Sequence, residues 1–185
     1  MLAFASFFFG FSSLFGAAYT VDGAHTNVAF KVKHMMISTV NGEFKKFSGN
    51  YELDESTKTL KSMSAEIDVA SINTNIDKRD DHLRSADLFD AKKYPKMTFV
   101  LDKVKGDKVY GKLTIKDVTK EVVLDYDFGG TIEDPSGNMR SGFTLSGEVN
   151  RIDYNIKWNK ILESGGVAVS EKVKLEINIE GIEAQ

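Results

Sequence analysis

Apolar and polar positions alternate with a period of two residues along most of the chain after residue 18. The clearest case is the segment 173–180, where four apolar side chains alternate with lysine, glutamate and asparagine. Runs of the same kind predict further strands over 28–32, 42–53, 63–69, 97–105, 109–115, 122–128 and 143–149. A strand with one apolar and one polar face is typical of an antiparallel sheet.

The segment 71–90 departs from this alternation and predicts a short helix over about 75–85. Thr74 followed by Asp77 resembles a capping box at its start. Asp80 and Arg84 stand four residues apart, with the acid on the N-terminal side, which is the favoured order for an ion pair on a helix.

About eight one-faced strands must bury their apolar faces against each other, and a closed barrel does this without leaving exposed edges. We therefore predict an all-β fold, an antiparallel barrel with a short helical excursion. A barrel of this size is either packed by its own side chains or wide enough to hold one small apolar ligand. The periodicity does not decide between these two interiors.

The first eighteen residues are uncharged and contain six of the thirteen phenylalanines. They end in Gly16-Ala17-Ala18, and small residues at this place are typical of a cleavage site. The segment is shorter than the about 20 apolar residues that a spanning helix needs. We expect residues 1–18 to be a secretory signal peptide and residues 19–185 to be the domain. The alternative is a buried N-terminal helix of the domain.

The composition of the chain excludes several classes of function. The 24 Lys and Arg against 27 Asp and Glu give a net charge of −3, which argues against a nucleic-acid partner. The absence of cysteine excludes disulfides, thiol catalysis and cysteine-ligated metals. The sequence has neither a glycine-rich phosphate loop after a strand nor a G-x-S-x-G motif, so it predicts no cofactor and no catalysis.

Several stretches, spread over residues 25–153, closely resemble the YceI-like family. They are His25–Phe30 (HTNVAF), SINT at 71–74, RDDHLRSADLFD at 79–90, YPKMTF at 94–99, GKLTIKDVTK at 111–120 and the segment 142–153. The resemblance implies a lipocalin-like antiparallel barrel in the periplasm. It also implies that the barrel binds a long-chain amphiphile, such as a polyisoprenoid, inside.

The apolar faces supply the candidate ligand-binding residues. Ten side chains are expected to point into the barrel: Phe30, Phe99, Leu101, Val122, Leu124, Tyr126, Phe143, Leu145, Leu175 and Ile177. Burial of one methylene is worth about 0.8 kcal/mol, so a long chain can gain affinity from burial alone. The leading hypothesis is thus a periplasmic carrier of a polyisoprenoid or fatty-acyl lipid, with no stable membrane insertion after cleavage. A homodimer is left open.

Three polar residues of the helical excursion are candidates for a head-group contact: Arg79, His82 and Arg84. A guanidinium matches an oxyanion well, although a structural ion pair explains these arginines too. His82 would otherwise hold the helix against the barrel. One rival hypothesis is a metal-dependent or hydrolytic enzyme centred on Asp80, Asp81 and His82, although no histidine pair has a familiar metal-binding spacing. The other rival is a ligand-free stress or interaction barrel.

Overall fold

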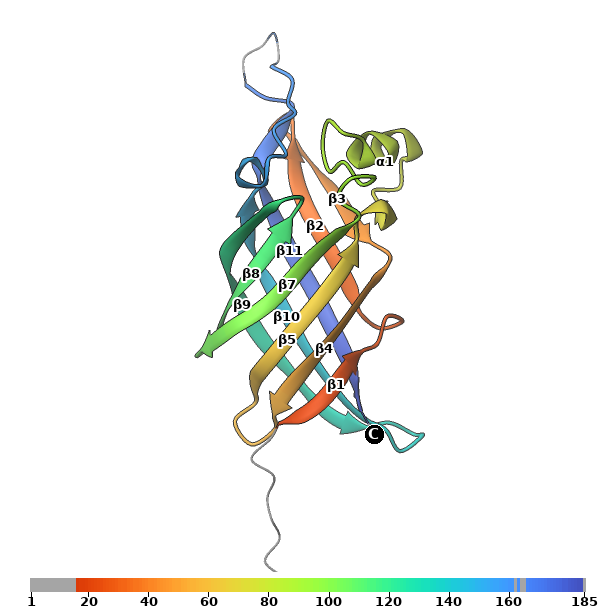
Figure 1. Cartoon of the computed structure of the whole chain (residues 1–185), viewed down its shortest axis with the longest axis vertical. Helices are drawn as coiled ribbons and strands as arrows, with labels where there is room; N and C mark the ends of the chain where they lie inside the picture. The colour runs from red at the N-terminus through yellow and green to blue at the C-terminus, as the bar shows by residue number, and fades with distance from the viewer. Residues whose placement is uncertain (1–15, 162, 164–165, 185) are drawn as a thin grey trace, which may run out of the picture.

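The computed structural model describes residues 16–161, 163 and 166–184 (Figure 1). Antiparallel strands dominate this part of the chain, joined by one α-helix and two short 3-10 turns. The strands are β1 (Ala17–Val21), β2 (Asn27–His34), β3 (Ser38–Phe44), β4 (Phe47–Asp54), β5 (Thr59–Asp68), β6 (Ile72–Asn73), β7 (Lys96–Lys105), β8 (Lys108–Ile115), β9 (Val118–Glu133), β10 (Met139–Asn150) and β11 (Val169–Glu183). The helix is α1 (Asp77–Arg84), and the 3-10 turns are η1 (Val69–Ser71) and η2 (Arg151–Tyr154).

Eight of the described strands form a closed ring in the order β1, β4, β5, β7, β8, β9, β10 and β11. The ring closes where β1 pairs with the last residues of β11, with Tyr19 opposite Glu183. The earlier part of β11 pairs instead with β2, which carries β3 and then β6 on its outer side. The all-β, antiparallel barrel with one short helix is therefore confirmed.

The closed ring has eight strands, but eleven strands are described in all, so the sequence analysis predicted too few and two of its assignments were wrong. The strand expected over 42–53 is two strands, because the chain turns a corner at Lys45 and Lys46 between β3 and β4. The ring also contains β1, which the alternation did not reveal because it continues the apolar leader. Ala17 and Ala18 already belong to β1, opposite Leu53 and Glu52. Residues 1–15 lie outside the described residues, so cleavage before Tyr19 stays a prediction.

The helix forms where the sequence predicted it, but it does not begin with a capping box. Its N-cap residue is Ile76, and Thr74 lies too far upstream to cap the helix with Asp77. Thr74 instead donates its hydroxyl to Asp80 Oδ1 at 2.5 Å and its backbone N–H to the same atom at 2.9 Å. Helical side chains lean toward the N-terminus, which brings the Asp80 carboxylate back to this turn.

The expected ion pair between Asp80 and Arg84 is also absent among the described contacts. The buried Asp80 carboxylate is already engaged by Thr74. Arg84 turns the other way, with Nη2 donating to Asp81 Oδ1 at 2.8 Å and Nη1 to the Ile72 carbonyl at 3.1 Å. Arg84 therefore ties the helix to β6.

Two clusters of buried apolar side chains fill different parts of the barrel. One, here called the closed-end core, contains Tyr19, Tyr51, Leu53, Leu60, Met63, Phe99, Val109, Leu124, Phe143, Leu145 and Ile179. The other lies at the α1 end, where Val69, Ile72, Leu88 and Tyr154 pack together. No helix among the described residues is long and apolar enough to cross a membrane.

Candidate ligand-binding cavity

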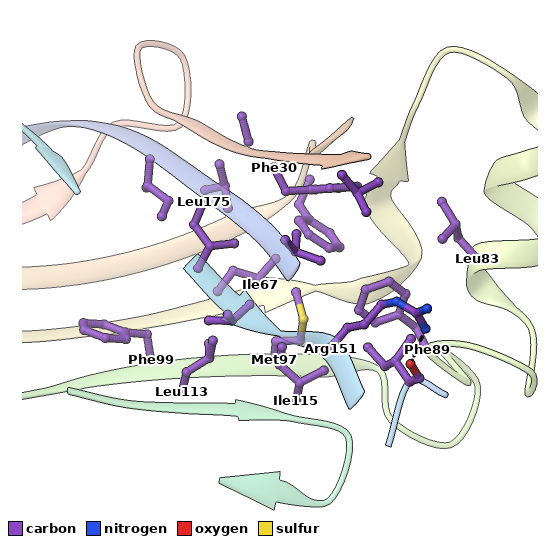
Figure 2. A pocket seen from close by; sticks show the side chains of 18 of the residues that line it. Phe30, Ile67, Leu83, Phe89, Met97, Phe99, Leu113, Ile115, Arg151 and Leu175 are labelled. Carbon is purple, nitrogen blue, oxygen red and sulfur yellow. Dashed lines mark hydrogen bonds between the residues drawn. The ribbon is translucent and has the colours of Figure 1, made fainter. Parts of the chain in front are cut away.

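A cavity of about 380 Å³ lies inside the barrel and extends to its α1 end. Its wall is made almost entirely of apolar side chains contributed by strands on all sides (Figure 2). The volume falls within the roughly 300–1,000 Å³ that is usual for small-molecule sites. The exposed residues Lys33, His34 and Trp158 also line the cavity, so it reaches the surface between β2 and the segment 156–168. Exposed Ser48 on β4 lines it too, at a second place.

The interior of the other end is filled by packed side chains, and a more open hollow lined by Tyr19, Tyr51 and Leu101 lies beside them. The rings of Tyr19 and Tyr51 stack with centroids 5.1 Å apart, and Phe143 meets Tyr51 edge-on at the same distance. The Tyr51 hydroxyl donates to the Ser141 carbonyl at 3.2 Å, and burial raises the pKa of Tyr51 to about 12. Gly181 leaves space for this phenol, because a Cβ there would lie 2.4 Å from the Tyr51 hydroxyl oxygen. The barrel is thus hollow toward α1 and packed at its far end.

The ten predicted interior residues fall into two groups, although three that line the cavity, Phe99, Leu124 and Leu145, also belong to the closed-end core. Seven of them line the cavity: Phe30, Phe99, Val122, Leu124, Leu145, Leu175 and Ile177. The other three, Leu101, Tyr126 and Phe143, pack in or against the closed-end core. The Tyr126 hydroxyl donates to the Lys58 carbonyl at 3.1 Å, which anchors this side chain away from the cavity.

Two glycines shape the cavity wall by giving room to aromatic rings on the neighbouring strand. Gly42 on β3 lies opposite Phe30 on β2, and a Cβ at Gly42 would lie 2.2 Å from the Phe30 Cζ. Gly111 on β8 does the same for Phe99 on β7, where a Cβ would approach the ring Cζ to 2.5 Å. Each ring therefore occupies the space above a glycine of the neighbouring strand.

Polar groups gather at the α1 end of the cavity. Of the three predicted head-group residues, Arg79 and His82 line the cavity, whereas Arg84 does not. Arg79 donates from Nε to the Thr74 hydroxyl at 2.7 Å and from Nη2 to the Thr74 carbonyl at 2.8 Å. The His82 ring packs edge-on against Trp158 with centroids 4.8 Å apart, which joins α1 to the segment 156–168.

A further cation at this end, Arg151, was missed by the sequence analysis. Its buried guanidinium lines the cavity and donates to the carbonyls of Ile156 at 2.6 Å, Trp158 at 2.9 Å, Ser170 at 2.9 Å and Val169 at 3.2 Å. Burial lowers the pKa of Arg151. Among the described residues no carboxylate forms a salt bridge with it, so a positive charge stands beside the cavity wall.

The residues of the rival enzyme hypothesis turn to different partners. Asp80 bonds to Thr74, Asp81 to Arg84, and the His82 Nε2 lies 3.6 Å from Asp87 Oδ2. The three side chains are therefore engaged in separate contacts that hold the excursion in place.

Within the described ranges, one group has ligand atoms close enough to hold a metal: Asp22, His25 and Glu180, near the closed end of the barrel. Arg140 Nη1 already donates to Asp22 Oδ2 at 2.9 Å and to Glu180 Oε1 at 2.7 Å, so a guanidinium supplies the cation there. The hydrogen bonds from His25, the Ala24 backbone and Arg140 lower the pKa of Asp22 to about 2. This group is an ion-pair network that ties β1 to β10 and β11.

Comparison with known proteins agrees with this architecture. The UPF0312 protein SAS2572 of Staphylococcus aureus (strain MSSA476) is 39% identical over 163 residues, covering 88% of this chain and 95% of the relative. The crystal structure of a Campylobacter jejuni YCEI protein is 37% identical, with 89% and 96% of the two chains covered and a TM-score of 0.73. A polyisoprenoid binding domain from Saccharophagus degradans shares the fold at 17% identity, with 91% and 99% covered and a TM-score of 0.67. The family model of the YceI-like domain matches residues 19–181, and the chain belongs to this family.

Proposed function

We propose that this protein is a periplasmic carrier that holds one long-chain amphiphile, of polyisoprenoid or fatty-acyl type, with its chain inside the barrel. The observation that carries this proposal is the apolar cavity of about 380 Å³ that ends in a group of polar side chains. The polyisoprenoid binding domain from Saccharophagus degradans, which has the same fold, supports a polyisoprenoid-like ligand.

The cavity suits a ligand with one apolar and one polar end. The chain would lie between Phe99, Leu145 and Leu175, where the wall offers only hydrocarbon. The head group would lie at the α1 end beside Arg79 and His82, with the charge of Arg151 nearby. An anionic or strongly polar head group fits these cations best.

Binding of this kind depends on chain length more than on chain identity. Each buried methylene contributes about 0.8 kcal/mol, which corresponds to about fourfold in affinity. A methylene more or less discriminates weakly between related chains, so the carrier should accept several chain types of similar length.

A chain-length series tests the proposal. Delipidated protein is titrated with fatty acids and with isoprenoid alcohols of increasing length, below their micelle concentrations. Affinity should rise with each added carbon and then level off when the chain fills the cavity. Affinity that does not depend on chain length would contradict a chain-binding cavity.

The periplasmic location has its own test. Protein recovered from the cell envelope of a host that exports it should have an intact mass that begins at or close to Tyr19. Recovery of a soluble cytoplasmic form that still begins at Met1 would contradict both the location and the expected boundary of the mature domain.

A further inference from the structure

Most of the exposed large apolar side chains lie at the end of the barrel where the cavity opens. Five of them form what we call the mouth patch: Met35 (41% exposed), Met36 (63%), Ile37 (84%), Trp158 (37%) and Ile161 (82%). Exposed apolar residues elsewhere, such as Val100 and Val123, occur singly on the outer faces of strands. A concentration at one place marks an interaction site, whereas single exposed residues are ordinary.

The two segments that carry the mouth patch are neighbours in the fold. The turn between β2 and β3 is tied to the segment 156–168 by the Met35 N–H, which donates to the Ala168 carbonyl at 2.8 Å. Ile161 and Val167 form a β-bridge within that segment, and the Ala168 N–H donates to the Lys160 carbonyl at 2.9 Å. Figure 1 shows the turn and the described part of that segment at the end of the barrel that carries α1. The mouth patch is therefore continuous with the rim of the cavity.

The left-handed backbone of the β2–β3 turn is conformationally unfavourable for the two exposed methionines that it carries. Met35 and Met36 have φ values of 50° and 62°, and the Ile37 N–H donates to the His34 carbonyl at 3.2 Å, which closes a tight hairpin turn. Asparagine and glycine are the residues that favour left-handed φ in such turns. Methionine there bears a conformational cost and exposes apolar surface, so the stability of the fold does not account for it.

The charge around the mouth patch is positive although the chain as a whole carries −3. Lys157 and Lys160 lie in the segment 156–168, with one acid, Glu163, and Lys33 lies near the end of β2, two residues before Met35. None of the three lysines forms a salt bridge within the part of the chain that the structure describes. Exposed apolar side chains flanked by lysine, with a tryptophan beside them, are typical of surfaces that enter the interface of an anionic bilayer.

We propose that the mouth patch docks the barrel reversibly on the surface of an anionic phospholipid bilayer, with the cavity opening toward the membrane. This rests on the proposed function, because a long-chain ligand that passes directly between bilayer and cavity avoids exposure of its chain to water. A second copy of the chain fits the mouth patch less well. A two-fold interface would bring together two patches that carry the same positive charge.

The single tryptophan of the chain, Trp158, belongs to the mouth patch and reports docking directly. Protein is mixed with vesicles of phosphatidylcholine, or of phosphatidylcholine with phosphatidylglycerol, and binding is measured by co-sedimentation. Trp158 fluorescence is followed with a nitroxide on the lipid head group as quencher. Wild-type protein should bind the anionic vesicles more tightly, with its fluorescence quenched.

The test variant is Met36→Asn with Ile37→Ser, in which asparagine suits the left-handed turn and keeps the hairpin folded. It should weaken vesicle binding about tenfold or more, because two side chains no longer enter the bilayer. Lys160→Gln should weaken binding to anionic vesicles about fivefold. The matched control is Val100→Ser with Val123→Ser, which removes exposed apolar side chains away from the mouth and should leave binding unchanged.

Binding of a soluble fluorescent fatty acid, measured without vesicles, separates the two proposals. One outcome is that wild-type protein binds this probe, while the Met36→Asn, Ile37→Ser variant binds vesicles as tightly as wild-type protein does. The docking proposal is then wrong and the carrier function stands. If wild-type protein binds vesicles but not the probe, the carrier function is wrong. A dimer in solution that the mouth-patch variant converts to monomer would assign the patch to a second copy and overturn the docking proposal.

Discussion

Two valines on neighbouring strands offer a direct comparison between the hollow and the packed half of the barrel. Val122 on β9 lies opposite Gly111 on β8 and lines the cavity. Val109 on β8 lies opposite Leu124, is 0% exposed and belongs to the closed-end core. We predict that Val109→Phe lowers the Tm and that Val122→Phe leaves it nearly unchanged, although the chemical change is the same.

The magnitudes follow from the space available at each position. Val109→Phe adds a ring to a filled core, and such overpacking costs about 1–3 kcal/mol of the free energy of unfolding. For a chain of this size the corresponding fall in Tm is roughly 2–12 °C. Val122→Phe directs its ring into a cavity of about 380 Å³, so its Tm should change by less than about 2 °C while less lipid is bound.

Differential scanning calorimetry of both delipidated variants measures the Tm values, and mass spectrometry of organic extracts measures the lipid per protein. Similar losses of Tm in the two variants would refute the hollow interior. Undiminished lipid content in Val122→Phe would refute the placement of the ligand in this cavity.

Three further predictions concern the wall, the ion-pair network and the buried arginine. Gly42→Ala should displace the Phe30 ring and lower the free energy of unfolding by about 1–3 kcal/mol, measured by urea denaturation. The pKa of Asp22 is lowered from 3.8 to about 2, so the stability that its carboxylate contributes is present above pH 4 and is lost as the pH falls toward 2. Asp22→Asn should flatten the dependence of Tm on pH in that range, and an unchanged profile would contradict the ion-pair network. Arg151→Leu should cost at least about 2 kcal/mol, because four carbonyls lose their donor, and full stability in urea would contradict this.

The sequence predicted most of the strands because alternation depends only on which side of a sheet each residue occupies. It could not predict depth along the barrel axis. Leu101, Tyr126 and Phe143 pack in or against the closed-end core, beside the stacked rings of Tyr19 and Tyr51, and do not line the cavity. Which half stays hollow depends on how side chains from strands far apart in the chain meet.

The α1 end was harder to predict for the same reason. The spacing suggested a capping box at Thr74 and an ion pair between Asp80 and Arg84. In the structure Thr74 donates to Asp80 instead, and Arg84 donates to Asp81. Arg151 gave no signal by spacing, because its partners are backbone carbonyls whose positions depend on the loop after η2. Local patterns identify such residues as polar, whereas their partners come from tertiary structure.

The central claim is that one long-chain amphiphile occupies the barrel, and native mass spectrometry of protein purified gently from an exporting host tests it most directly. The account predicts a complex heavier than the mature chain by the mass of a single lipid, which is released intact on collisional activation. A spectrum that shows only the mass of the unliganded chain, before and after addition of polyisoprenoid or fatty acid, would contradict it.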